Sequence, residues 1–293
     1  MDEQDITLLL TLDRTRNLTH AADELYITQS SVSKRVRLLE ESLGATLMLR
    51  SRHGIQFTPS GEVVLNACKK IKSSLETMRS ELNVLGGVIA GTVRAGISVN
   101  YATYRLPAVL SEYNNRYPAV DTQITAANSS KIYTMLLANK IDLGIIRGEY
   151  LKWNGTSVLL DREHICAICQ AGCSKEDFMQ IPYIKRQSGS DMERDIAQWL
   201  QENPLRPVKN RISAATTGII VNMVSHGLGW SVVPEICLDE FKGKIYPLYF
   251  ENGEPLTRST YLMYSPRMLE LPQVRAFIEL IRQHEKERQA KNA

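Results

Sequence analysis

The chain has 293 residues, more than the roughly 100 to 200 that are typical of one domain, so its length predicts at least two folded units. A hydrophobic fraction of 43% excludes a wholly disordered chain, and a net charge of +3 is too small to indicate nucleic-acid binding by itself. No secretory pattern opens the sequence and no apolar run approaches the roughly 20 residues that span a bilayer. We therefore expect a cytoplasmic protein that does not enter a membrane.

Residues 18–36 predict two short helices joined by a turn. Small side chains in the first helix, Ala21 and Ala22, allow a second helix to cross it closely. The second helix has apolar residues at positions i, i+4 and i+7, which give it an inward face: Val32, Val36 and Leu39. The pattern is that of a helix-turn-helix, although Tyr26 stands where the turn commonly has glycine.

The opposite face of the second helix carries polar side chains suited to base edges and phosphates. They follow helical spacing, with Gln29 beside them: Ser30, Ser33, Lys34 and Arg37. An ordinary helical hairpin with a solvated face would show the same spacing, so this pattern alone leaves both interpretations open.

The segment 47–58 predicts a short hairpin that turns at His53–Gly54, where a DNA-binding wing would lie. Residues 1–90 are balanced in charge, but basic residues outnumber acidic ones between the second helix and this hairpin. The combination favours DNA binding over a plain hairpin. The side chains that we expect to contact DNA are Thr28, Gln29, Ser30, Ser31, Ser33, Lys34, Arg37, Arg50 and Arg52.

Residues 59–85 predict one long helix with an apolar stripe. Thr58 can cap it, Pro59 suits its first turn, and Gly86, Gly87 and Gly91 would end it. At 1.5 Å per residue, about 27 residues would extend roughly 40 Å. The stripe is exposed along this length, so the helix needs a partner: Val64, Ala67, Ile71, Leu75, Met78, Leu82 and Leu85.

After Gly91 the pattern changes to strands that alternate with helices, which predicts parallel α/β structure. Strands are expected at 92–98, 120–127, 143–148, 182–185, 211–213 and 229–234, with helices around 196–200 and over 217–226. Two α/β lobes fit this length. The charged segment 282–291 is expected to be the frayed end of a last helix.

A small-molecule site in such lobes belongs at the carboxyl ends of strands. The polar residues at those places are Ser98, Asn100, Asn128, Ser129, Arg147, Gln187, Ser188, Thr216 and Thr217. Each could also be an ordinary helix cap or turn residue. Helix N-termini after Ser98, Asn128 and Thr216 favour an anion, with Arg147 as its charge partner unless Arg147 pairs with Glu149 or with a neighbouring lobe.

The segment 164–173 contains Cys166, Cys169 and Cys173 and resembles a zinc site on spacing alone. It alternates as a strand, however, so Cys166 and Cys169 would face opposite sides of a sheet. Buried structural cysteines are the better interpretation, with a redox role for Cys169 or Cys173 left open. We find no phosphate loop and no nucleophile–histidine arrangement, and we expect no metal, no cofactor and no enzyme activity.

The N-terminal pattern resembles that of LysR-type transcriptional regulators, and the similarity extends over essentially the whole chain. The matching positions are Ala21–Ala22, Leu25, Gln29–Ser30, Val32–Ser33, Leu39–Glu40, Leu43–Gly44, Arg50, Thr58 and Gly61. Met48 stands where phenylalanine is common, and Pro59–Ser60 replaces an acidic residue and an alanine. The resemblance implies a multidomain fold: an all-α winged helix-turn-helix, a long linker helix that pairs between subunits, and two Rossmann-like lobes resembling periplasmic binding proteins.

The expected domains are a DNA-binding domain at 1–58, a linker helix and hinge at 59–91, and an effector-binding domain at 92–293. Within the last, lobe I takes 92–161 and 266–293, and lobe II takes 162–265. The resemblance also implies a tetramer built as a dimer of dimers.

These features predict a transcription regulator controlled by a small, anionic effector. Its expected partners are double-stranded DNA with a dyad-symmetric operator, the effector, further copies of itself and RNA polymerase. The alternative is a ligand-binding or catalytic α/β protein whose N-terminal helices only mediate dimerisation.

Overall fold

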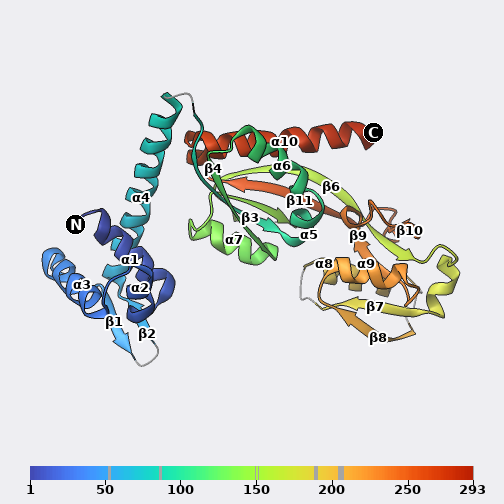
Figure 1. The fold of residues 1–293 in the computed structure, drawn as a ribbon. Helices are drawn as coiled ribbons and strands as arrows, with labels where there is room; N and C mark the ends of the chain where they lie inside the picture. The colour runs from blue at the N-terminus through green and yellow to red at the C-terminus, as the bar shows by residue number, and fades with distance from the viewer. Residues whose placement is uncertain are drawn as a thin grey trace. The chain divides into compact units, whose positions relative to one another are not determined.

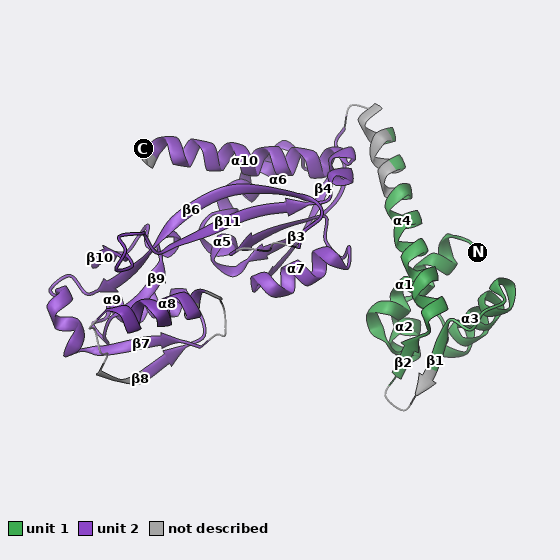
Figure 2. Ribbon diagram, turned by 180° about the vertical axis from the view of Figure 1, so that it is seen from behind, with its two compact units in different colours: residues 1–86 green, residues 87–293 purple. Residues whose placement is uncertain are grey.

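The computed structural model describes residues 1–51, 54–85, 88–148, 150, 152–187, 191–203 and 208–292. The chain divides into two compact units, residues 1–86 and 87–293, which Figure 2 colours separately. Each helix among the described residues is either too short or too polar to span a bilayer.

Among its described residues, the N-terminal unit contains four helices and one hairpin (Figure 1), including the two short helices, the hairpin and the long helix that the sequence predicts. Its elements are α1 (Glu3–Thr15), α2 (Leu18–Glu24), α3 (Gln29–Leu43), β1 (Met48–Ser51), β2 (Gly54–Phe57) and α4 (Pro59–Leu85). The strands pair antiparallel, with Ser51 opposite Gly54. The predicted turn at His53 lies outside the described residues.

Alanines make the close crossing of α2 and α3 possible. Ala21 and Ala22 are buried, as are Val32, Val36 and Leu39 on the inward face of α3. Gly61 allows a second close approach, of α4 to the backbone at Leu47. A Cβ at position 61 would overlap the backbone carbonyl of Leu47. The predicted inward face and the predicted helix-turn-helix are therefore confirmed.

The first part of α4 is fastened to the helical core. Leu65 and Cys68 are buried in that core, and Lys69 Nζ lies 2.9 Å from a carboxylate oxygen of Asp13 on α1. Thr58 caps the helix, since its hydroxyl accepts from the backbone N–H of Gly61 at 3.0 Å. Farther along, the apolar side chains of the predicted stripe are exposed: Ile71, Met78 and Leu82.

The second unit begins with a parallel sheet in the strand order β4–β3–β5. The elements of this first lobe are β3 (Gly91–Ser98), α5 (Val99–Tyr104), α6 (Leu106–Arg116), β4 (Val120–Ala127), α7 (Ser129–Leu137) and β5 (Leu143–Arg147). A late strand, β11 (Thr257–Tyr264), inserts antiparallel between β5 and the long strand β6 (Thr156–Cys169). The expected boundary of lobe II at residue 265 therefore needs correction, because β11 belongs to the sheet of the first lobe.

The second lobe continues from the far half of β6. Its elements are β7 (Pro182–Arg186), α8 (Asp191–Glu202), β8 (Val208–Ala214), α9 (Thr217–Ser225), β9 (Ser231–Pro234), β10 (Lys244–Pro247) and short 3₁₀ helices at Lys175–Met179 and Glu235–Cys237. A further 3₁₀ helix, Pro266–Glu270, follows β11 and packs in the core of the first lobe through Met268. β6 pairs with both β9 and β10, and β7 pairs parallel with β8. Separate hydrophobic clusters hold the α8 side chain Trp199 and the α9 side chain Ile220.

The last helix, α10 (Pro272–Asn292), packs along the first lobe (Figure 1). The sequence predicts a frayed charged end here, and that prediction is wrong. Glu285 is buried and accepts a hydrogen bond from Tyr101 Oη of α5 at 2.8 Å and one from Arg288 Nε at 3.0 Å. Burial, with the nearby Glu285 carboxylate, raises the pKa of Tyr101 well above its ordinary value. The charged end is helical because its side chains find partners on the lobe.

Candidate DNA-binding surface and effector site

The start of α3 is organised by the side chain of Thr28. Its hydroxyl accepts from the backbone N–H of Ser31 at 3.2 Å and lies 2.9 and 2.8 Å from the hydroxyls of Ser30 and Ser31. Thr28, Gln29, Ser30 and Ser31 are all exposed. The N-terminal turn thus presents a small cluster of hydroxyls and an amide, groups that can donate to or accept from base edges.

Farther along, the same face becomes charged. Gln29 Nε2 reaches the Ser33 hydroxyl at 3.4 Å, Lys34 is exposed, and Arg37 Nε donates to Glu41 Oε1 at 2.8 Å. The Arg37 side chain is 80% exposed and that of Glu41 is 56% exposed. The face predicted from spacing therefore forms one continuous surface.

Arg35 does not belong to this surface, although the sequence places it among the local basic residues. Its guanidinium donates to Asp5 at 2.5 Å and to Asp2 at 2.8 Å, both at the start of α1. The hydrogen bond to Asp5 is the main cause that raises the pKa of Arg35. Arg35 thus joins α3 to α1.

The hairpin is anchored beside α1, where the backbone N–H of Ile55 donates to the carbonyl of Arg16 at 2.9 Å. Arg50 lies on β1 by its backbone, whereas its side chain and all of Arg52 lie outside the described residues. The two predicted wing contacts consequently remain predictions.

Tyr26 is a feature of the turn whose conformation sequence reasoning did not anticipate. Its φ of +54° is left-handed, and 95% of the residue is exposed. Left-handed backbone is unfavourable for residues with a Cβ and favours glycine. The sequence feature that could have indicated this conformation is Tyr26 itself, which stands where the turn commonly has glycine.

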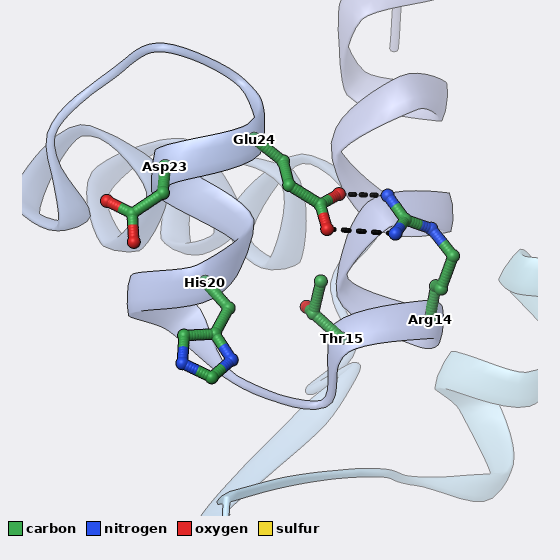
Figure 3. Close-up of a pocket in the computed structure, with 5 residues that line it drawn as sticks. All are labelled: Arg14, Thr15, His20, Asp23 and Glu24. Atoms are coloured by element: carbon green, nitrogen blue, oxygen red, sulfur yellow. Dashed lines mark hydrogen bonds and ion pairs between the residues drawn. The ribbon is translucent and has the colours of Figure 1, made fainter.

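A surface hollow of about 410 Å³ is lined by residues of α1 and α2, which Figure 3 shows. Arg14 of α1 pairs with Glu24 of α2 through both carboxylate oxygens, while His20 and Asp23 lie apart from this pair. The Arg14–Glu24 pair joins two helices. The five described residues that line the hollow have no buried side-chain nitrogen or oxygen without a hydrogen-bond partner, so nothing there indicates a ligand.

The second candidate site lies at the carboxyl ends of the parallel strands. Ser98 ends β3, and its register partner on β4 is Ala127, which precedes Asn128 and Ser129. Asn128 caps α7 by accepting from the N–H of Lys131 at 2.9 Å, and the Ser129 hydroxyl accepts from the N–H of Arg147 at 3.0 Å. The strands thus bring four of the predicted effector residues to one edge: Ser98, Asn128, Ser129 and Arg147.

The two lobes meet beside this edge. The Tyr104 hydroxyl of α5 forms a hydrogen bond with the thiol of Cys237 from the second lobe. The same hydroxyl lies close to Gly218 in the first turn of α9, where an added Cβ would be 3.2 Å from it. Arg105 also pairs with Asp239. Thr216 and Thr217, at the start of α9, therefore lie close to α5.

Four buried polar atoms at this junction have no hydrogen-bond partner among the described residues. One is the Nε of Arg105, whose guanidinium pairs with Asp239 through another nitrogen. The other three are Ser98 Oγ, Thr217 Oγ1 and Arg147 Nε, and these residues are only 4%, 1% and 6% exposed. Buried polar groups without partners are costly, so their presence together indicates a place where another molecule can bond.

Arg147 already has a charged partner. Its guanidinium pairs with Glu163 on β6, which also accepts from the backbone N–H of Ile236. Burial raises the pKa of Glu163, while the Arg147 charge acts in the opposite direction. The sequence left open whether Arg147 pairs within the protein, and it does, with a residue that was not foreseen.

The other predicted effector residues are less central. Gln187 is exposed, and its Nε2 donates to the Ser213 hydroxyl at 2.7 Å. Asn100 is half-buried on α5, Thr216 caps α9 by accepting from the Ile219 N–H at 3.4 Å, and Ser188 lies outside the described residues.

The cysteines of β6 lie as the strand alternation predicts. Cys166 and Cys169 belong to different hydrophobic clusters, and burial raises the pKa of each thiol to about 12. Within the described ranges, no group of three or more His, Cys, Asp or Glu side chains could hold a metal ion.

Comparisons with known proteins find relatives for both units of the chain. Residues 4–62 match the family of bacterial regulatory helix-turn-helix proteins of the LysR type, and residues 86–286 match the LysR substrate binding domain. An uncharacterized HTH-type transcriptional regulator of Bacillus subtilis (strain 168), YraN, is 31% identical over 284 residues, covering 96% of this chain and 98% of that protein.

Two solved structures share the fold. A full-length OxyR variant from Pseudomonas aeruginosa aligns with a TM-score of 0.69 at 18% identity, covering 98% of this chain and 95% of that one. Full-length CbnR in complex with its target DNA aligns with a TM-score of 0.61 at 15% identity, covering 97% and 100%.

A helix-turn-helix unit joined to a two-lobed α/β unit defines a DNA-binding transcription regulator with an effector-binding domain, and not an enzyme. The chain belongs to the LysR family of transcriptional regulators.

Proposed function

We propose that this regulator binds dyad-symmetric operator DNA through the exposed face of α3 and the β1–β2 hairpin. The main observation in support is that the Thr28 cap leaves a continuous polar face on α3, from Gln29 to Arg37. The proposed contacts are Thr28, Gln29, Ser30, Ser31, Ser33, Lys34, Arg37, Arg50 and Arg52. Residues 1–58 would form the DNA-binding domain, 59–91 the linker and 92–293 the effector-binding domain.

The test is a mobility shift with the full-length protein and the DNA upstream of its own gene, in the presence of nonspecific competitor. Arg37→Ala should weaken binding, and Ser33→Ala should change sequence preference more than overall affinity. Binding no stronger than to unrelated DNA would favour the alternative, a ligand-binding α/β protein whose N-terminal helices only dimerise.

Two copies would be held together along α4. An exposed apolar stripe on a single helix favours a second helix of the same kind, and a family tetramer would add a second pair. Ile71→Glu should split the pair in light scattering, with Glu62→Lys, before the exposed stretch, as the control. An unchanged mass for Ile71→Glu would contradict the α4 interface.

The effector is proposed to be a small anion at the junction of the lobes. Support comes from buried polar atoms on Ser98, Thr217 and Arg147 that have no hydrogen-bond partner among the described residues. The helix N-termini of α7 and α9, at the same place, also favour an anion. Because Glu163 already balances the charge of Arg147, the anion would bond the free Nε and the hydroxyls rather than an unpaired cation. Further contacts are proposed for Asn100, Asn128, Ser129, Gln187, Ser188 and Thr216.

A panel of small carboxylates and their neutral amides, tested by thermal shift on the full-length protein, examines this site. Carboxylates should raise the melting temperature more than amides, because binding to the folded state stabilises it. Ser98→Ala should reduce that effect, whereas Ser225→Ala, on the exposed side of α9, should not. Equal shifts for acids and amides would remove the anionic class.

An effector controls the regulator only if it binds one arrangement of the lobes more tightly than another. Transcription activation would add RNA polymerase as a partner. A reporter driven by the upstream DNA, with and without the regulator, separates activation from repression.

A further inference from the structure

Glu41 extends the candidate DNA-binding face of α3. Ser30, Lys34 and Arg37 are followed on the same side of the helix by residue 41, at positions i, i+4, i+7 and i+11. Its carboxylate accepts from Arg37 Nε at 2.8 Å, and both side chains are largely exposed. A surface built to meet polyanionic DNA therefore includes an acidic side chain, bonded to one of its own cations.

Helix stability gives only weak support to an acidic residue at position 41. Glu41 lies in the last turn of α3, where the helix dipole disfavours a negative charge. The pair also runs from arginine to glutamate along the chain, which is the less favourable orientation at i,i+4 spacing. An acidic residue at this position thus needs a reason outside the isolated helix.

The neighbouring acid shows what a structural role looks like. Glu40 Oε1 accepts from the backbone N–H groups of Leu47 and Met48 at 2.7 and 3.3 Å, so it holds the segment that enters β1. Within the described residues, the side chain of Glu41 instead contacts Arg37. Of the two adjacent glutamates, one fastens the fold and the other holds a cation of the α3 face.

Several other basic side chains of this unit are also held by acids. Arg14 pairs with Glu24, Arg16 and Lys69 pair with Asp13, and Arg35 pairs with Asp2 and Asp5. Lys34 has no acidic partner among the described residues, so it and Arg37 supply the positive charge along the described face of α3. The state of Arg37 consequently has a large influence on attraction to phosphate.

We propose that Glu41 is a specificity-determining residue that weakens binding to nonspecific DNA by holding Arg37. On an arbitrary duplex, Arg37 must leave Glu41 to reach a phosphate, and the carboxylate is then near the DNA backbone. On the operator, the other contacts of α3 fix the register and offset this cost. This inference rests on the proposed DNA-binding face.

The experiment measures mobility shifts of the full-length chain on its upstream DNA and on an unrelated duplex of equal length, over a range of salt. For Glu41→Gln, affinity for the unrelated duplex should rise about three- to tenfold at low salt, with a log–log salt slope steeper by about one, as expected for one more phosphate contact. Affinity for the upstream DNA should rise less, so the ratio of the two falls.

Glu287→Gln, which removes an exposed charge from α10, is the matched control and should leave both affinities unchanged. The double variant Arg37→Ala/Glu41→Gln separates the two ways in which Glu41 could act. If Glu41 acts through Arg37, the gain disappears in the double variant. A gain that persists there would overturn the proposed role of Arg37.

Parent-like affinity of Glu41→Gln for the unrelated duplex would overturn the proposal altogether. Glu41→Ala repeats the comparison with a different side chain, and circular dichroism verifies that both variants are folded. A parent that does not prefer its upstream DNA would count against the proposed operator, while the unrelated duplex would still decide the role of Glu41.

Discussion

The face of α3 and the junction of the two lobes are both polar, but they are built in opposite ways. The α3 face consists of exposed side chains that are bonded to one another, such as Arg37 with Glu41 and Gln29 with Ser33. The junction instead holds buried atoms, on Ser98, Thr217 and Arg147, that find no hydrogen-bond partner in the part of the chain that the structure describes. The exposed contacts on the first surface are weak, and the Arg37–Glu41 ion pair among them is sensitive to salt. Each buried group at the junction instead costs stability when it is left without a hydrogen bond.

This difference fits the partners that we propose for the two sites. DNA is long and highly charged, so many modest contacts on an open surface suffice. A small molecule offers few atoms, and a site must surround it with groups that have no other use. Variants at the two sites should therefore differ in what they change: stability at the junction and salt-dependent affinity on α3.

The largest effect is expected for Glu163→Ala, which leaves the buried guanidinium of Arg147 without its charge partner. Removing one member of a buried pair typically costs about 3–5 kcal/mol, whereas breaking an exposed pair costs about 1 kcal/mol or less. Urea unfolding should show this loss for Glu163→Ala and little change for Glu41→Ala. Replacing both members, as in Arg147→Met/Glu163→Leu, should recover most of it. If the two alanine variants lost equal free energy of unfolding, the proposed difference between the two sites would be wrong.

A smaller effect, of opposite sign, is expected for Thr217→Val. The substitution keeps the shape and removes a buried hydroxyl that lacks a partner, so the effector-free protein should become more stable by about 1–2 kcal/mol. Thr103→Val is the control, because the Thr103 hydroxyl already donates to the carbonyl of Val99 at 2.8 Å. Destabilisation by Thr217→Val would show that the hydroxyl is satisfied in solution.

On the DNA side, Lys34→Ala should lower affinity for the upstream DNA by about tenfold or less and reduce the salt slope by about one, because one phosphate contact is lost. The unfolding free energy should hardly change, since Lys34 is exposed. Lys175→Ala, in the second unit, is the control for loss of a positive charge. A salt slope that stays the same would place Lys34 away from the phosphates.

The smallest effect is expected for Tyr26→Gly in the turn before α3. Relief of left-handed strain, less the extra freedom of glycine in the unfolded chain, should stabilise the protein by roughly 0.5–1 kcal/mol. Tyr26→Ala keeps the strain and should not stabilise. If both variants also weaken DNA binding, the exposed ring belongs to the DNA-binding surface as well.

Features set by local spacing could be predicted from the sequence. The periodic stripe and its caps gave α4 the bounds Pro59–Leu85, and alternation placed β3, β4 and β7. The inward face of α3 and the opposite faces of Cys166 and Cys169 follow from the same periodicities.

Partners that are distant in sequence could not be predicted. Arg147 and Glu163 lie on strands separated by β11, which comes about a hundred residues later in the chain, so no local pattern relates them. Arg35 adds to the local excess of basic residues in the sequence, but its charge is neutralised by acids some thirty positions earlier. The charged end of α10 seemed suited to solvent because its partner Tyr101 lies 184 positions away.

The place of α10 also sets an order on synthesis. Val274, Phe277, Ile278 and Ile281 share one core with Val93 and Ile97 of β3, so the first lobe is built from both ends of its unit (Figure 1). Residues 1–86 form a separate compact unit and can fold while the ribosome is still at work, as N-terminal domains generally do. The core of the first lobe is completed only when α10 has been made. A nascent chain therefore acquires its DNA-binding unit before the lobe that is to control it, and a ribosome stalled near residue 270 would leave that lobe's core uncovered.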